Sequence, residues 1–217
     1  MGFYTKDRVG YKRFIPLYSH VSVSYNLSLA INFEYSQSML TNTTTLILGG
    51  ARSGKSRYAE KIAMATNKEL TYIATSKILD EEMKQRVARH KKDRALSNWA
   101  TIEEPISLAK TLKQWASPER IILVDCLTMW LTNLLLEETS ILEKETNAFL
   151  DCIHNLSGDV IFVSNEVGMG IIPVGELTRQ FVDETGRLHQ ELAQRVENVI
   201  LMVAGLPHKI KINGKTN

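Results

Sequence analysis

Residues 49–56 are the segment whose types and spacing point most directly to chemistry. They read Gly-Gly-Ala-Arg-Ser-Gly-Lys-Ser and match the pattern Gly-x-x-x-x-Gly-Lys-Ser of a phosphate-binding loop. Backbone N–H groups of such a loop, and of the helix that follows it, surround phosphate oxygens. Lys55 would neutralise the β- and γ-phosphates as a catalytic residue, and the Ser56 hydroxyl would bind Mg²⁺. The predicted nucleotide contacts in this segment are Gly49, Gly50, Ala51, Arg52, Ser53, Gly54, Lys55 and Ser56.

The residues on either side of this loop have the types that its mechanism requires. Residues 44–48 are apolar or β-branched, which favours a strand, and residues 57–65 are good helix formers. The alternative interpretation, a chance match inside a glycine-containing turn, does not explain a strand before the loop and a helix after it. We therefore predict that the chain binds a nucleotide.

A carboxylate follows the apolar run at 121–124. Asp125 stands downstream of the phosphate loop, where a Walker-B carboxylate would bind Mg²⁺ directly or through water. The alternative is that Asp125 caps a helix that begins at Leu127. We favour the metal role because the apolar residues precede Asp125 in the right chain order. Ser56 and Asp125 are thus the predicted Mg²⁺-binding residues.

The apolar run at 160–163 leads into a loop that contains two glycines and Pro173. Asn165 and Glu166 open this loop. Their side chains either contact substrate or the water shell of the metal, or stabilise a turn. Both interpretations stay open at this point.

A strongly charged helix is predicted over residues 80–94, beginning at Asp80. His90 lies in it among basic residues, which disfavour imidazolium and would leave a neutral, nucleophilic ring. The same cations would bind a triphosphate. The alternatives are a surface histidine and a solvated charged face.

Strands and helices alternate after residue 44. Short apolar runs predict strands that are buried on both faces, at 44–49, 70–74, 121–124, 160–163 and 199–203. Helices are predicted at 80–94, at 105–116 with Pro105 in the first turn, at 141–156, and around Leu188, Leu192 and Val196. The fold class is α/β, a three-layer domain with a mostly parallel sheet, whose ligands bind at the carboxyl ends of the strands.

Composition limits the classes of function. The 217 residues carry a net charge of +2, and that excess lies in the first 45 residues. The neutral body does not favour binding of nucleic acid or of a membrane surface. Cys126 and Cys152 lack metal-ligand spacing, and we interpret them as small buried side chains in a reducing, cytoplasmic setting.

The first 43 residues differ from the rest in composition. Five of the seven tyrosines lie there, without a helical or alternating period. No apolar run is long enough to span a bilayer, so we expect no membrane anchor. We interpret residues 1–43 as a poorly ordered N-terminal extension, or as an upstream mis-start with the true initiator at Met39, and residues 44–217 as one P-loop nucleotide-binding domain.

Several segments together resemble the bifunctional adenosylcobinamide kinase/adenosylcobinamide-phosphate guanylyltransferase family. The resemblance covers about residues 44–212. It rests on the phosphate loop and on six later segments: Tyr72-Ile73-Ala74-Thr75-Ser76, Asp80 to His90, Asp125-Cys126-Leu127-Thr128, Thr132-Asn133-Leu134-Leu135, Asn165 to Pro173, and Val203 to Lys211. It implies a P-loop NTPase-type fold. It further implies that ATP or GTP phosphorylates a corrinoid alcohol, and that GTP then donates GMP to that phosphate through a guanylyl-histidine.

The resemblance also assigns residues. His90 matches the histidine that carries GMP, and the cations around it would offset phosphate charge. Further nucleotide contacts are carried over to Thr75, Ser76, Lys91, Lys92, Asp93, Arg94, Glu103 and Asp125. The sequence departs from the family where Arg89 replaces a second histidine of some relatives and where Asp125 replaces a glutamate. Members of the family are expected to form homo-oligomers, with trimers the expected form.

Two other classes of function compete with this interpretation. A monofunctional P-loop kinase for another small alcohol has no use for a histidine nucleophile at position 90. A nucleotide-dependent switch or assembly factor is disfavoured by the neutral body and by the absence of the Asn/Thr-Lys-x-Asp guanine motif. Guanine preference therefore rests on the resemblance.

Overall fold

A computed structural model describes residues 3–6, 12–15, 43–77 and 98–216. The chain separates into two compact units, Met1–Ser38 and Met39–Asn217. In the first unit, β1 (Phe3–Lys6) pairs antiparallel with β2 (Lys12–Ile15). The predicted helix at 80–94 lies outside the described residues.

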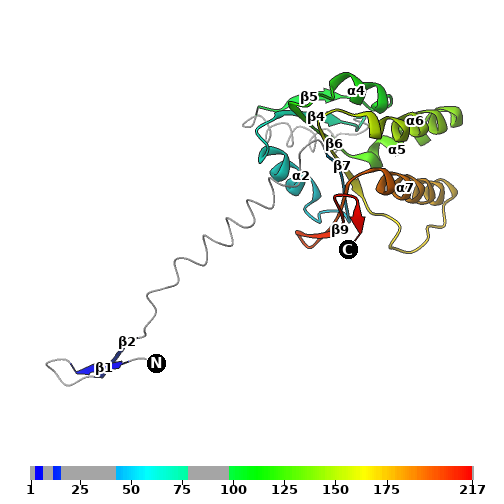
Figure 1. The fold of residues 1–217 in the computed structure, drawn as a ribbon. Helices are drawn as coiled ribbons and strands as arrows, with labels where there is room; N and C mark the ends of the chain where they lie inside the picture. The colour runs from blue at the N-terminus through cyan, green and yellow to red at the C-terminus, as the bar shows by residue number, and fades with distance from the viewer. Residues whose placement is uncertain (1–2, 7–11, 16–42, 78–97, 217) are drawn as a thin grey trace. The chain divides into compact units, whose positions relative to one another are not determined.

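The second unit is built on an eight-stranded sheet in the order β10-β9-β8-β3-β7-β6-β4-β5 (Figure 1). All strand pairings from β8 to β5 are parallel, and β9 and β10 add antiparallel pairings at one edge. The strands are β3 (Thr44–Gly49), β4 (Glu69–Ala74), β5 (Ala100–Glu103), β6 (Arg120–Asp125), β7 (Asp159–Asn165), β8 (Asn198–Val203), β9 (Leu206–Ile212) and β10 (Lys215–Thr216).

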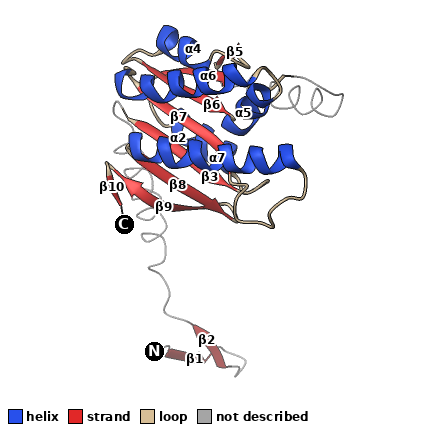
Figure 2. Cartoon of the chain, turned by 90° about the vertical axis from the view of Figure 1, so that its right-hand side faces the viewer, coloured by secondary structure: helices blue, strands red, loops and turns tan. Residues whose placement is uncertain are grey.

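Helices cover both faces of this sheet, which gives three layers. Figure 2 looks onto the face that carries most of the helices, with α2 behind the sheet. The helices are α2 (Lys55–Met64), α4 (Leu108–Trp115), α5 (Leu127–Leu135), α6 (Thr139–Cys152), the short 3₁₀ helix η1 (Ile153–Asn155) and α7 (Glu176–Arg195). The prediction of an α/β domain with a mostly parallel sheet is confirmed.

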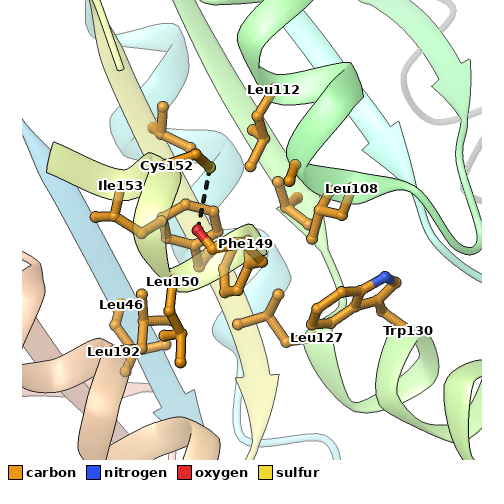
Figure 3. Packing of buried hydrophobic residues seen from close by; sticks show 14 of the residues in the cluster. Leu46, Leu108, Leu112, Leu127, Trp130, Phe149, Leu150, Cys152, Ile153 and Leu192 are labelled. Carbon is orange, nitrogen blue, oxygen red and sulfur yellow. Dashed lines mark hydrogen bonds between the residues drawn. The ribbon is translucent and has the colours of Figure 1, made fainter. Parts of the chain in front are cut away.

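Two hydrophobic cores lie on opposite faces, because successive side chains of a strand point to opposite sides. The larger core packs α4, α5, α6 and α7 against the sheet (Figure 3). Its centre is Phe149 of α6, whose ring lies 5.1 Å from that of Trp130 and 5.3 Å from that of Phe162 in edge-to-face contacts. The smaller core packs α2 through Ala59 and Ile62. Burial on both faces explains why β3, β6 and β7 read as continuous apolar runs.

Three details of the sequence prediction need correction. The helix predicted from Pro105 begins at Leu108 instead, because the Glu104 carboxylate accepts hydrogen bonds from Ile106 N at 3.0 Å and Ser107 N at 2.7 Å and stabilises a turn there. Strand β5 was missed because it is short and mostly exposed. The antiparallel edge was likewise not predicted.

None of the helices in residues 43–77 and 98–216 combines the length and the apolar character that a membrane span requires.

Candidate nucleotide-binding site

The phosphate loop connects the end of β3 to the start of α2 through a backbone that only particular residues adopt. Gly49 has φ 152°, Gly54 has φ 95° and Arg52 has φ 57°. A Cβ atom on Gly49 would lie 2.6 Å from the carbonyl oxygen of Met202 in β8. A glycine is required there because no side chain fits between the two strands.

Hydrogen bonds from two other segments hold this loop. Glu166 N, just after β7, donates to Gly49 O at 2.9 Å. Gly205 N, in the turn between β8 and β9, donates to Ser53 O at 3.0 Å. Within the loop, Ser53 N donates to Gly50 O at 3.2 Å. The loop is therefore fixed by segments more than 100 residues away, and its shape does not have to be created when a nucleotide binds.

The side chain of Lys55 lies inside the loop. The residue is 7% exposed, and its Nζ donates to Gly50 O at 2.7 Å. Burial lowers the pKa of this ammonium group, while the negative charge of Asp125 and the nearby Cys126 thiol act in the opposite direction. The charge of Asp125 therefore acts on the Lys55 ammonium group. A phosphate would offer Lys55 a charged acceptor in place of a carbonyl.

The start of α2 is suited to an anion. Its N-cap, Gly54, makes no side-chain capping bond, and no acidic residue lies in the first turn. The first N–H groups of a helix have no intrahelical partner and carry partial positive charge. In addition, Ser53 Oγ is buried and has no hydrogen-bond partner among residues 43–77 and 98–216. These donors are what a bound phosphate would satisfy.

Asp125 is the last residue of β6 and lies opposite Val163 of β7 and Ala74 of β4. The N-cap of α5 is Cys126, so the alternative in which Asp125 caps that helix is not observed. Among the described residues, no three His, Cys, Asp or Glu side chains gather around a metal position. Mg²⁺ typically uses one or two carboxylates with phosphate and water oxygens, and Asp125 with the half-buried Ser56 fits that pattern.

The other predicted nucleotide contacts at this edge, Thr75, Ser76 and Glu103, differ in burial and in hydrogen bonding. Thr75 is fully buried: its hydroxyl donates to Cys126 O at 2.7 Å and accepts from Cys126 N at 2.9 Å. Asn133 Nδ2 of α5 donates to Thr75 O at 2.6 Å. In this structure Thr75 therefore joins the ends of β4 and β6. Ser76 follows it and is half-buried, and Glu103 lies exposed at the end of β5.

The structure brings the predicted residues at 49–56, Thr75, Glu103 and Asp125 to one edge of the sheet. The register explains this, because Ala74 pairs with both Asp125 and Glu103, and Gly49 pairs with Asn165. His90 and residues 91–94 lie outside the described residues, so their roles stay predictions.

Glu166 uses its carboxylate to stabilise a turn. It accepts from Gly168 N at 2.7 Å and from Met169 N at 3.2 Å. Of the two interpretations left open by the sequence, turn chemistry is the one observed for Glu166.

His189 was given no role by the sequence, and it lies close to the site. Its Nε2 is 2.7 Å from the hydroxyl of the fully buried Ser164, at the end of β7. Burial lowers the pKa of His189 to about 4, and the charge of Glu166 opposes that shift. The available signal was its place beside Leu188 on the buried stripe of α7, next to a strand end that already carried Asn165 and Glu166.

A comparison with known protein families identifies the family of this chain. The family described as cobinamide kinase / cobinamide phosphate guanyltransferase matches residues 45–210. The chain belongs to this family. The match begins in β3 and includes the phosphate loop, Asp125 and the segment between β7 and α7.

Curated relatives are similar over the same part of the chain. The bifunctional adenosylcobalamin biosynthesis protein CobP of Pseudomonas aeruginosa is 52% identical over 167 residues, covering 76% of this chain and 96% of that protein. The bifunctional adenosylcobalamin biosynthesis protein CobU of Escherichia coli is 37% identical over 180 residues, covering 76% and 98%. The resemblance found in the sequence is confirmed, and the chain is a member of an enzyme family of cobalamin biosynthesis.

Two solved structures resemble this one at low sequence identity. A protein of Pyrococcus horikoshii OT3 is 13% identical, with a TM-score of 0.50 and coverage of 85% of this chain and 97% of that chain. The flagellar accessory protein FlaH of Methanocaldococcus jannaschii is 15% identical, with a TM-score of 0.47 and coverage of 82% and 84%. The likeness to the Pyrococcus horikoshii protein concerns the fold alone.

Proposed function

We propose that this protein phosphorylates the alcohol of adenosylcobinamide with ATP or GTP and then transfers GMP from GTP to the new phosphate. The observation that carries the proposal is the buried ammonium group of Lys55, which donates to Gly50 O inside the phosphate loop and is influenced by the charge of Asp125. Membership of the family over residues 45–210 supports the identity of the acceptor.

In the first reaction, the acceptor oxygen attacks the γ-phosphorus of the triphosphate. The bond from that phosphorus to the β–γ bridging oxygen breaks, the nucleoside diphosphate leaves, and the hydroxyl proton passes to solvent. The loop N–H groups and Lys55 stabilise negative charge on the phosphates throughout. Mg²⁺, held by Ser56 and Asp125, would supply further positive charge. Because hydrogen bonds from Glu166 and Gly205 already hold the loop, little reorganisation should accompany this step.

In the second reaction, the His90 imidazole attacks the α-phosphorus of GTP and pyrophosphate leaves. The phosphate of the acceptor then attacks the same phosphorus, the bond to His90 breaks, and adenosylcobinamide-GDP forms. Lys91, Lys92 and Arg94 would offset charge on the departing groups. This step rests on the family pattern around His90.

A monofunctional small-molecule kinase is the second candidate. The phosphate loop with its buried Lys55 supports this candidate equally, because such an enzyme would use the same loop. The two candidates differ in the acceptor alcohol and in the use of His90 and of GTP.

Incubation with α-labelled GTP distinguishes these candidates. Denatured wild-type protein should carry acid-labile, base-stable label. His90→Ala should carry none and should still phosphorylate adenosylcobinamide, while His154→Ala, at an exposed histidine after α6, should behave like wild type. Unlabelled wild-type protein with intact kinase activity would leave only the second candidate.

We further propose a cytoplasmic homo-oligomer, with a trimer as the expected form, whose partners are the corrinoid and nucleoside triphosphates rather than nucleic acid. Light scattering on purified protein tests the oligomeric state. A molar mass equal to that of one chain would contradict it.

A further inference from the structure

The segment between β7 and α7, residues 166–175, exposes aliphatic side chains to an unusual degree. Met169 is 77% exposed, Ile171 98%, Ile172 78% and Val174 95%. Exposed apolar groups gathered in one short segment usually mark a binding surface, because water contact with them is unfavourable. None of the nucleotide contacts described above uses these four side chains.

Both ends of this segment are attached to the rest of the domain. At its start, the Glu166 carboxylate accepts from Gly168 N and Met169 N. At its end, Arg179 Nη1 of α7 donates to Val174 O and, at 3.4 Å, to Pro173 O. The exposed side chains are therefore presented between two fixed points.

The order of strands places this segment between the phosphate loop and Asp125. β7 lies between β3, which leads into the phosphate loop, and β6, which ends in Asp125. Gly49 pairs with Asn165, and Asp125 pairs with Val163, so β7 leaves the sheet between the two groups that the proposed function assigns to phosphoryl transfer. Figure 2 shows the connection from β7 to α7 extending beyond the sheet.

A hollow of about 240 Å³ in the same domain is also lined mostly by apolar side chains. It lies between α5 and α7 and is lined by Thr132, Leu135, Leu136, Leu177, Thr178 and Phe181. Leu177 follows the exposed segment directly, in the first turn of α7. Apolar lining with a few hydroxyl groups suits a ligand that carries both methyl and amide groups.

We infer that residues 169–174 and the hollow between α5 and α7 form the surface that binds the corrin ring of the acceptor. This inference rests on the proposed function and locates its second substrate. The corrin ring is a large macrocycle edged by methyl groups and amide arms, and only its hydroxyl-bearing arm has to enter the space between Lys55 and Asp125. The exposed aliphatic side chains contact the methyl-bearing edge. Thr178 is available to the amides, and the Thr132 hydroxyl, which donates to Thr128 O at 2.9 Å, can accept from one.

A second copy of this chain is the competing occupant of the same surface. The acceptor is favoured because the segment emerges between the phosphate loop and Asp125, where the acceptor must approach and where a subunit contact has no such requirement. The experiment below separates the two.

The test uses the full-length double variant Ile171→Asn/Val174→Asn, with Met64→Asn as the matched control. Both substituted residues are almost wholly exposed, so folding should be unaffected, and Met64 is a 47% exposed residue at the far end of α2. The KM for adenosylcobinamide should rise about tenfold, the factor that corresponds to about 1.4 kcal/mol, with the KM for ATP and kcat unchanged. The control should match wild type, and the molar mass should be the same in all three proteins.

An unchanged KM for adenosylcobinamide would overturn the inference. So would a smaller molar mass in the double variant, because the surface would then be a contact between copies of the chain. Equilibrium dialysis with adenosylcobinamide, followed by its visible absorbance, should show the same weakening without turnover. If wild-type protein binds adenosylcobinamide but does not phosphorylate it, the proposed function fails while the dialysis still tests the inference.

Discussion

The phosphate loop and the segment at 166–175 leave neighbouring parallel strands at the same edge of the sheet, and they are built in opposite ways. The phosphate loop surrounds a buried lysine with backbone groups, and Gly49 has no room for a side chain. The other segment presents side chains to water, and Gly170 has no neighbour within 4 Å of where its Cβ would lie. A loop that binds a constant group such as phosphate depends on its backbone, whereas a loop that contacts a particular acceptor depends on its side chains.

The largest effect is expected in the phosphate loop. Lys55→Ala should lower kcat for phosphorylation about a hundredfold to a thousandfold, as loss of one preorganised charged donor does. Initial rates with ATP and adenosylcobinamide measure this. Lys61→Ala, on the exposed side of the last turn of α2, is the control and should retain wild-type rates. Equal rates in the two variants would remove Lys55 from the site.

The contact between His189 of α7 and Ser164 of β7 should make the stability of the protein depend on pH. The folded-state pKa of His189 is about 4, below its usual value of 6.5, so the unfolded chain takes up a proton first as the pH falls. Stability should be full above pH 6.5 and should decrease by up to about 3 kcal/mol between pH 6.5 and pH 4. Urea unfolding at several pH values measures it.

His189→Gln is the matched variant for that experiment, because glutamine keeps a polar group near Ser164 and cannot take up the proton. Its stability should vary less between pH 6.5 and pH 4 than that of the wild type. His154→Gln, at an exposed site, should leave the wild-type profile intact. An identical profile in all three proteins would show that another group causes the dependence.

A methyl group added to each loop tests their difference directly. Gly49→Ala would place a Cβ 2.6 Å from Met202 O and should destabilise the protein by about 1–3 kcal/mol, because the strand backbone cannot move aside cheaply. Gly170→Ala meets nothing within 4 Å and should be neutral for folding. Thermal unfolding of both variants measures the contrast, and similar midpoints would contradict it.

The smallest effect concerns the attachment of the exposed segment. Glu166→Ala removes the acceptor for Gly168 N and Met169 N, and it should cost about 1 kcal/mol or less because water can replace an exposed carboxylate. Limited proteolysis should then cut within residues 167–174 sooner than in wild type. Glu176→Ala, in the first turn of α7, is the control. Cleavage at the wild-type rate in Glu166→Ala would show that the turn holds without the carboxylate.

The central strands could be predicted because parallel strands between two helical layers are apolar along their whole length. β3, β6 and β7 were accordingly identified within one or two residues at each end. β5 and β9 lie near or at the edges and are mostly exposed, so their sequences lack that pattern. The start of α4 was misplaced for a different reason. Pro105 suits a first helical turn, but the Glu104 carboxylate accepts from Ile106 N and Ser107 N and stabilises a turn there instead.

The sequence by itself determined the phosphate loop, the carboxylate at Asp125 and the family, because each depends on residue types at short, constant spacings along the chain. Only the tertiary structure decided which distant groups meet at that loop. Gly205 and Glu166 hold its backbone, Thr75 is used to join two strand ends, His189 lies against Ser164, and the aliphatic side chains at 169–174 face water. These relations depend on strand order and register, which bring together residues far apart in the chain and leave no local pattern in it.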